Sequence, residues 1–189
     1  MSQIRLLITD FDGTLVDTFE PNFLAYREAF SKYGLSLSKK QYSDCFGLRF
    51  DDFMKRMKID EEHKKAGIRR FKSKIYPMFF DKLKVNKSLI MILQSFKLSG
   101  GMTAVASTAR KENLMNVLNH LGISDIFSLI LSGEDVKEGK PHPEIYQKVL
   151  KELGVSPDES LVFEDSFVGI ESAKSAGINH ILVNKEYFE

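Results

Sequence analysis

Short, continuous apolar runs recur along this chain, separated by longer segments in which apolar residues return every three or four positions. Runs of the first kind are typical of strands buried on both faces of a sheet. Helical spacing appears instead at Leu114, Val117 and Leu118. From residue 86 onward the two patterns alternate, which predicts an α/β fold with a doubly wound parallel sheet. The predicted strands are residues 4–9, 102–106, 127–131, 161–163 and 180–183.

Residues 17–84 break this rhythm, because their apolar residues repeat at helical spacing and no convincing strand interrupts them. Phe23 and Tyr26 begin one such apolar stripe. A stretch of about 70 residues is far longer than one crossover connection needs. We therefore expect an α-helical cap domain at 17–84, inserted into a core domain made of residues 1–16 and 85–189.

Composition mainly excludes classes of protein. The 27 lysines and arginines nearly balance the 26 aspartates and glutamates, so no large single-sign field draws in nucleic acid or an anionic membrane. No apolar run approaches the length of a membrane span, and the run before Asp10 fits a core strand better than a signal peptide. The single cysteine, Cys45, can form no internal disulfide, and the histidines lack metal-ligand spacing. We expect a cytoplasmic protein without nucleic-acid or membrane partners, monomeric or weakly homodimeric.

Two carboxylates, Asp10 and Asp12, follow the first predicted strand, and Gly13 comes directly after them. The strand period of two sends both side chains the same way. Open α/β sheets bind ligands at the carboxyl ends of their strands. Most isolated Asp-x-Asp pairs are nevertheless turns or solvated acids. The pair therefore gains meaning only together with residues at other strand ends.

Other strand ends carry polar residues that suit phosphate and metal. Ser107 follows a strand and precedes a helix, where its hydroxyl and the following amides could hold phosphate. Lys140 is followed by two prolines in close succession, whose restricted backbone could hold its charge beside a phosphate. Glu164 and Asp165 follow another apolar run and offer the oxygen ligands that Mg²⁺ prefers. Each of these residues alone has an ordinary interpretation, as a helix cap or a solvated charge.

These elements, in this order, resemble the haloacid dehalogenase-like (HAD) hydrolase superfamily over nearly the whole chain. The resemblance rests on Asp-Phe-Asp-Gly-Thr at 10–14, Ser107, Lys140 within Gly-Lys-Pro-His-Pro, and Phe-Glu-Asp-Ser at 163–166. It implies a Rossmann-like core with a helical cap, as in the branch that contains phosphoglycolate phosphatases and β-phosphoglucomutases. True dehalogenases lack an aspartate at the place of Asp12, so the resemblance favours phosphoryl chemistry.

The resemblance also implies roles. Asp10 would attack phosphorus and form an aspartyl-phosphate, while Asp12 would act first as general acid and then as general base. Mg²⁺ would be held by Asp10, Asp165 and the backbone carbonyl of Asp12, with Glu164 as a further or outer-shell partner. The expected function is that of a Mg²⁺-dependent phosphatase for a small phosphorylated metabolite, similar to phosphoglycolate phosphatase.

Four residues are expected to contact the substrate or its phosphate. Lys140 would compensate negative charge, and Ser107 and Thr108 would hold the transferring oxygens. In the cap, Arg49 would bind a carboxylate or a second phosphate on the leaving group. A solvated arginine at a helix start is an equal alternative for Arg49.

Two other functions remain open. A phosphomutase of the β-phosphoglucomutase kind would use the same aspartates, but such enzymes tend to have a histidine at the cap position of Asn22. A non-enzymatic module that binds phosphorylated ligands is disfavoured, because the nucleophile Asp10 is present. Val85 and Asn86 stand where many relatives have Pro-Gly, and we expect this difference to alter the cap linker rather than the chemistry.

Overall fold

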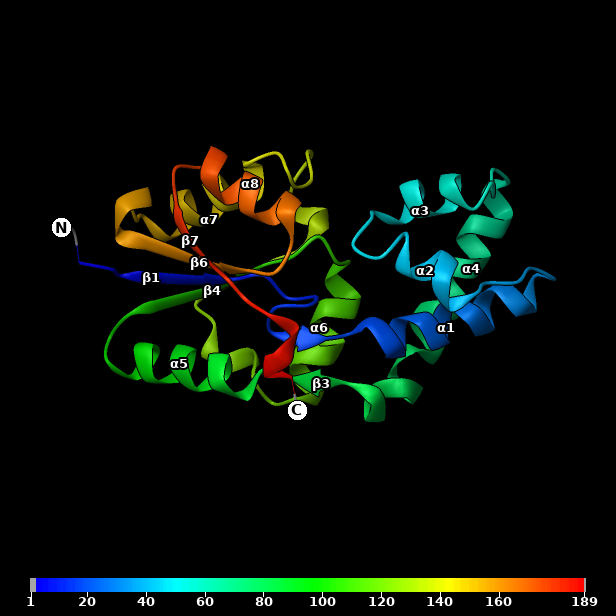
Figure 1. Cartoon of the computed structure of the whole chain (residues 1–189), viewed down its shortest axis with the longest axis horizontal. Helices are drawn as coiled ribbons and strands as arrows, with labels where there is room; N and C mark the ends of the chain where they lie inside the picture. The colour runs from blue at the N-terminus through cyan, green and yellow to red at the C-terminus, as the bar shows by residue number, and fades with distance from the viewer. Residues whose placement is uncertain (1–2, 189) are drawn as a thin grey trace. The chain divides into compact units, whose positions relative to one another are not determined.

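The computed structural model describes residues 3–188, which form two compact units (Figure 1). The first unit ends at Asp17 and resumes at Lys84, and the second unit runs from Thr18 to Leu83. The second unit is therefore an insertion between two parts of the first. Among the described residues, no helix is long and apolar enough to cross a membrane.

A five-stranded parallel sheet forms the centre of the first unit, in the order β5-β4-β1-β6-β7. This arrangement confirms the predicted doubly wound α/β fold. The strand predicted at 102–106 has the predicted ends, and the other four predicted strands are present with slightly different ends. The strands are β1 (Leu6–Thr9), β4 (Met102–Ala106), β5 (Leu129–Leu131), β6 (Ser160–Glu164) and β7 (Asn179–Leu182).

Helices cover both faces of this sheet, with α7 and α8 on one side and α5 and α6 on the other (Figure 1). The apolar stripe of α7, which includes Ile145 and Tyr146, packs into one buried cluster with Leu6 and Ile8 of β1. The helices are α5 (Lys87–Leu98), α6 (Lys111–His120), α7 (Glu144–Leu153) and α8 (Phe167–Ser175), with short 3₁₀ turns at Ser124–Ile126, Gly133–Asp135, Pro157–Glu159 and Lys185–Tyr187.

Strand β1 lies between β4 and β6, which follow it much later in the sequence. Thr9, at the end of β1, pairs with Val105 of β4 and with Phe163 of β6. On one side of β1 the sheet continues with β4 and β5, and on the other side with β6 and β7. Open α/β sheets bind ligands at such a switch point in the strand order. The residues directly after Thr9, Val105 and Phe163 therefore meet at one edge of the sheet.

Two short antiparallel strands carry the chain out of the first unit and back into it. They are β2 (Val16–Asp17) and β3 (Lys84–Val85), and Val16 pairs with Val85. Asn86 follows β3 directly and caps α5, because its side chain accepts a hydrogen bond from the backbone N–H of Leu89.

The second unit is helical and has its own aromatic core. Tyr42 lies within 6 Å, between ring centroids, of Phe19, Phe23 and Phe53, and such ring pairs add to the stability that burial supplies. Ser38 caps the second helix through a reciprocal pair of bonds with Gln41. The helices are α1 (Phe19–Lys32), α2 (Lys39–Ser43), α3 (Phe50–Arg56) and α4 (Glu62–Ile75), followed by the 3₁₀ helix η1 (Tyr76–Lys82).

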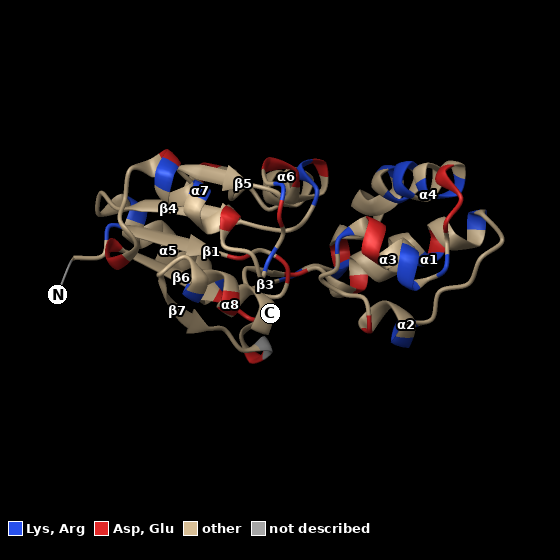
Figure 2. Ribbon diagram, turned by 90° about the horizontal axis from the view of Figure 1, so that it is seen from above, with Lys and Arg blue, Asp and Glu red and all other residues tan. Residues whose placement is uncertain are grey.

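Charged residues of both signs are interspersed on the helices of each unit (Figure 2). Ion pairs such as Lys39 with Glu20 and Arg69 with Asp51 are exposed, and exposed pairs contribute little to stability. The side chain of Lys140, by contrast, is only 3% exposed. A buried ammonium group needs buried partners, and these define the candidate site.

Candidate active site

The ammonium group of Lys140 joins the ends of three strands. Its Nζ atom donates to Oδ1 of Asp10 at 2.6 Å, to Oε1 of Glu164 at 2.6 Å and to the carbonyl of Ala106 at 3.0 Å. These acceptors follow β1, end β6 and end β4, respectively. The backbone N–H of Asp10 also donates to the carbonyl of Phe163 at 2.9 Å, so the sheet itself fixes the position of this carboxylate.

Glu164 accepts five hydrogen bonds and is fully buried. Its Oε1 accepts from Lys140 and, at 3.0 Å, from the hydroxyl of Tyr146. Its Oε2 accepts from the backbone N–H groups of Asp165 and Ser166 and from the Ser166 hydroxyl, at 3.1, 3.2 and 3.0 Å. Both oxygens of Glu164 are thus engaged by the protein, so this carboxylate orients Lys140 and the loop after β6.

The carboxylate of Asp165 is seated against the turn that follows β1. The hydroxyl of Thr14 donates to its Oδ1 at 3.0 Å. Gly13 has a φ of 97°, and a Cβ atom at this position would overlap the Asp165 carboxyl group. Glycine is therefore required here both by the backbone conformation and by the close approach of the acid.

Asp10, Glu164 and Asp165 form an acidic group whose ligand atoms lie within 4.8 Å of one another. Oxygen ligands at this spacing suit a hard cation such as Mg²⁺. Because the protein already engages both oxygens of Glu164, Asp10 and Asp165 are the better ligands and Glu164 fits an outer-shell position. The carboxylate of Asp12, which is half-buried, does not belong to this group among the described residues.

Electrostatics at the site favour an added cation. Burial raises the pKa of Asp10 well above its ordinary value, and Glu164 and Asp165 act in the same direction, although Lys140 opposes them. Burial alone would lower the pKa of Lys140, but the attraction of Asp10 and Glu164 keeps it well above its ordinary value. The ammonium therefore stays charged, yet one positive charge faces three acids, and a divalent cation can balance the remainder.

Ser107 and Thr108 follow β4 at the same edge of the sheet. The N–H of Ser107 donates to the carbonyl of Leu131 at 3.0 Å, and its hydroxyl accepts from the N–H of Ala109 at 3.0 Å. Ser107 is thus nearly fully buried in a turn and does not itself cap the following helix, which begins at Lys111. Its hydroxyl proton is still available to a ligand.

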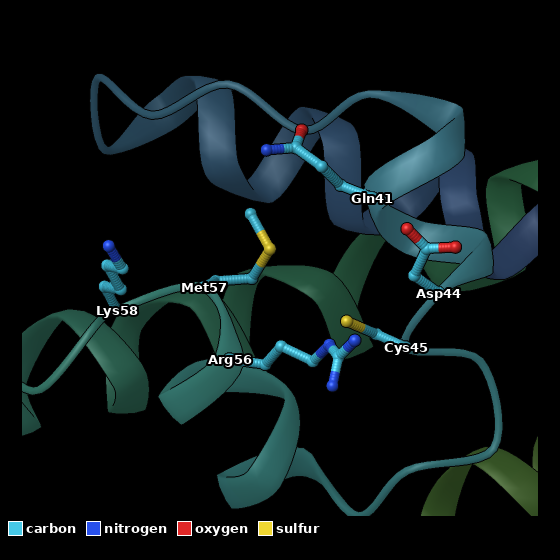
Figure 3. Close-up of a pocket in the computed structure, with 6 residues that line it drawn as sticks. All are labelled: Gln41, Asp44, Cys45, Arg56, Met57 and Lys58. Carbon is cyan, nitrogen blue, oxygen red and sulfur yellow. The ribbon is translucent and has the colours of Figure 1, made fainter.

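Arg49 lies in the second unit, directly before α3, and is half-buried. This unit also contains a pocket of about 280 Å³ (Figure 3). Arg49 is not among its lining residues, which are Gln41, Asp44, Cys45, Arg56, Met57 and Lys58.

Three residues of the site could not be found from the sequence in the roles they have here. Tyr146 stands within the apolar stripe of α7, where it is indistinguishable from a core residue. Thr14 belongs to the Asp-Phe-Asp-Gly-Thr segment, but nothing local indicates that its hydroxyl meets Asp165. Asn86 bonds to Thr14 although the whole inserted unit, Thr18–Leu83, lies between them in the sequence, and only the fold reveals this contact.

Comparison with known proteins agrees with this geometry. The family model described as "Haloacid dehalogenase-like hydrolase" matches residues 7–183. The chain therefore belongs to the haloacid dehalogenase-like hydrolase family, as predicted, and it is an enzyme, a phosphatase of that family that acts on phosphorylated compounds.

Individual relatives fall within the same family. The chain is 32% identical to the "Phosphorylated carbohydrates phosphatase" of Thermotoga maritima over 94% of its length and 84% of that protein. The structure of CbbY from Rhodobacter sphaeroides in complex with phosphate matches with a TM-score of 0.83 and 27% identity, over 95% of this chain and 86% of that one. The β-phosphoglucomutase of Clostridium difficile matches with a TM-score of 0.80 and 27% identity, over 98% and 87%.

Proposed function

We propose that this protein is a Mg²⁺-dependent phosphatase that hydrolyses a phosphate monoester of a small metabolite through an aspartyl-phosphate on Asp10. The observation that carries the proposal is the 2.6 Å contact between Lys140 and Asp10 inside a buried acidic group. Substrates of the sugar-phosphate class are the first to test, because one relative is named a phosphatase of phosphorylated carbohydrates.

The residues present fit a bound Mg²⁺ ion. Asp10 and Asp165 would hold it, because their carboxylates lie close together and Glu164 is engaged elsewhere. When bound, the cation supplies positive charge that lets an anionic phosphate approach two aspartates. The Asp12 backbone carbonyl remains a proposed third ligand.

In the first half of the proposed reaction, a carboxylate oxygen of Asp10 forms a bond to phosphorus while the bond from phosphorus to the leaving oxygen breaks. Asp12 gives its proton to that leaving oxygen. Lys140 remains charged throughout, since its raised pKa keeps the ammonium protonated, and it balances the charge on Asp10 and the phosphoryl oxygens. Ser107 and Thr108 donate to those oxygens.

In the second half, water replaces Asp10 on phosphorus. Asp12, now deprotonated, accepts a proton from the water, which attacks phosphorus as the bond to Asp10 breaks. Inorganic phosphate leaves, and Asp12 again carries the proton needed for the next cycle. The two steps therefore balance, and the net reaction consumes one water molecule.

The inserted unit is proposed to act as a cap that selects the substrate, with its boundaries near residues 17 and 84. Within it, Arg49 would bind an anionic group on the leaving part of the substrate. We also propose a cytoplasmic location, because the single cysteine, Cys45, is buried and forms no disulfide, as is usual in reducing compartments.

Phosphate release from a panel of phosphoglycolate, sugar phosphates and nucleotides tests this proposal, with Mg²⁺ and with chelator. We expect Mg²⁺-dependent release that Asp10→Asn abolishes. Asp125→Asn is the matched control, because it makes the same chemical change at an exposed position. Borohydride reduction during turnover should convert Asp10 to homoserine, detectable by mass spectrometry, if an acyl phosphate forms there.

The phosphomutase alternative is not favoured, since Asn22 stands where such mutases tend to have a histidine. Sugar 1-phosphates in the same panel separate the two activities. Release of inorganic phosphate without an isomeric sugar phosphate supports the phosphatase. Isomer formation without release would overturn it.

A further inference from the structure

Asn86 makes four hydrogen bonds where the chain returns from the inserted unit, one of them the helical bond that its carbonyl accepts from the N–H of Ile90 at 3.1 Å. Its backbone N–H donates to the carbonyl of Leu15 at 3.0 Å. Its side-chain Oδ1 accepts from the N–H of Leu89 at 3.0 Å, and its Nδ2 donates to the carbonyl of Thr14 at 3.2 Å. The residue is only 3% exposed. Asn86 thus binds the start of α5 to the segment that follows β1.

Thr14 continues this connection to the acidic group. Its carbonyl accepts from Asn86, while its hydroxyl donates to Oδ1 of Asp165 at 3.0 Å. Thr14 is completely buried, and the preceding residue, Gly13, is in contact range of the Asp165 carboxyl group. A displacement of Thr14 would therefore be felt directly at Asp165.

The amide side chain at position 86 is suited to both tasks at once. Serine, threonine and aspartate can also supply the oxygen that caps a helix. Only an amide of this size combines that acceptor with a separate N–H donor for the Thr14 carbonyl. Helix capping alone thus does not account for asparagine at position 86, whereas capping combined with holding Thr14 does.

The connection lies where the two units are joined. Val16 and Asp17 leave the first unit, and Lys84 and Val85 return to it as the paired strand. On the side of the first unit, Asn86 then bonds to Leu15 through its backbone N–H and to Thr14 through its side chain. A movement of the linker strands can therefore reach Asp165 through the bond between Asn86 and Thr14, beside the bond that the Gly13 N–H donates to the Val16 carbonyl at 2.9 Å.

We propose that Asn86 is a positioning residue that acts through Thr14 to hold the Asp165 carboxylate in place, and so sets the affinity of the acidic group for a divalent cation. The cation is part of the proposed function, on which this inference rests. Asn86 touches neither cation nor substrate. By holding Thr14, Asn86 keeps movements of the linker strands from displacing the Asp165 carboxylate.

Binding of Mn²⁺ to the full chain, followed by the loss of the free-ion EPR signal and by Mg²⁺ competition, tests this inference without any turnover. Asn86→Ser keeps a capping oxygen for Leu89 but cannot also reach the Thr14 carbonyl. Thr14→Val removes the bond to Asp165 with little change in shape. Ser156→Ala is the control, because it removes a hydroxyl that donates to Oε2 of Glu159 at 2.7 Å, in the same unit but before the opposite end of β6.

We expect Asn86→Ser to weaken cation binding about threefold to tenfold, which is at or below the lower limit for residues that bond a metal ligand directly, because Asn86 acts on Asp165 only through Thr14. Thr14→Val should weaken it at least as much, and adding Asn86→Ser to Thr14→Val should cause no further loss. Ser156→Ala should bind as the wild type does. In assays of turnover, the Mg²⁺ activation constant should rise by the same factor, while KM for substrate at saturating Mg²⁺ stays constant.

Unchanged cation affinity in Asn86→Ser, or additive losses in the double variant, would overturn the inference. So would a wild-type chain that binds neither Mn²⁺ nor Mg²⁺. A chain that binds Mn²⁺ but releases no phosphate from the panel contradicts the proposed phosphatase instead. The inference would then still stand or fall on the binding of the variants.

Discussion

The hydroxyl group of Tyr146 donates to the same oxygen of Glu164 that accepts from Lys140. The Lys140 ammonium also lies 5.0 Å from the centre of the Tyr146 ring. Tyr146 is completely buried on α7. A residue of the hydrophobic core thereby helps to fix the ammonium that faces Asp10.

Removing the Tyr146 hydroxyl should distinguish its role in positioning Lys140 from its contribution to folding stability. In Tyr146→Phe, Glu164 keeps its other four bonds but Lys140 loses part of its support. We expect a stability loss of about 1 kcal/mol in urea unfolding and a fall in kcat of up to about tenfold. Tyr187→Phe, at an exposed position, should change neither quantity. Equal kcat values in wild type and Tyr146→Phe would show that the bond plays no part in turnover.

Gly169 provides a second test of Glu164. A Cβ atom at Gly169 would overlap the Glu164 carboxylate, so Gly169→Ala should displace that group and with it Lys140. We expect kcat to fall on the order of 100-fold, as when a group that stabilises developing charge is lost. The measurement is steady-state kinetics at saturating Mg²⁺.

Gly100→Ala is the matched control for this change. Gly100 has a φ of 89° and open space around its Cβ position, so alanine there costs about 1–2 kcal/mol through backbone strain alone. It lies between α5 and β4, away from the carboxyl ends of the strands. A similar loss of kcat in both variants would mean that general destabilisation, not the displacement of Glu164, explains Gly169→Ala.

Asp10→Asn should stabilise the metal-free protein while abolishing turnover. Burial raises the pKa of Asp10 well above its ordinary value, so the charged form is unfavourable in the folded state. The gain should be about 0.5–2 kcal/mol at neutral pH, in the range of single stabilising substitutions. Urea unfolding with chelator measures it.

The pH dependence of this difference follows from the direction of the shift. The pKa of Asp10 is raised in the folded state. The contribution of Asp10 to the stability of the wild type is therefore fully present below the ordinary pKa of an aspartate, and it is lost as pH rises through the raised pKa. Wild type and Asp10→Asn should therefore converge in acid and diverge toward neutral pH. A difference that grows in acid would contradict the shift of Asp10.

Mg²⁺ should move the acid limit of activity. A cation and a proton compete for Asp10, whose raised pKa makes protonation effective at higher pH than for an exposed aspartate. We expect the acid limb of the kcat/KM profile to move to lower pH as the Mg²⁺ concentration increases. An acid limb independent of Mg²⁺ would assign that titration to another group.

The sequence predicted the strands well because residues buried on both faces leave continuous apolar runs, as at Leu6–Thr9 and Met102–Ala106. It also predicted that residues at strand ends would meet, and Asp10, Lys140 and Asp165 do gather at one edge. Their catalytic and metal-binding roles remain predictions.

Contacts across long sequence separations could not be predicted in this way. The bond from Tyr146 to Glu164 joins a helix face to a strand end, and no local pattern distinguishes that tyrosine from its apolar neighbours. Asn86 was expected to alter only the cap linker, yet its bond to Thr14 places it two contacts from Asp165. The spacing of apolar residues indicates which positions are buried, but it does not indicate which group a buried polar atom bonds to.

The position of β1 in the sheet also has consequences for folding. Leu6 pairs with Met102 and with Ser160, so β1 cannot pair with either neighbour until that later part of the chain has been synthesised. The inserted helical unit, Thr18–Leu83, is continuous in sequence and precedes both of them. Local helical contacts form faster than distant strand pairings, and domains fold in the order of synthesis. During translation the inserted unit can therefore fold while β1 is still unpaired, and β1 becomes a central strand only once β6 has emerged.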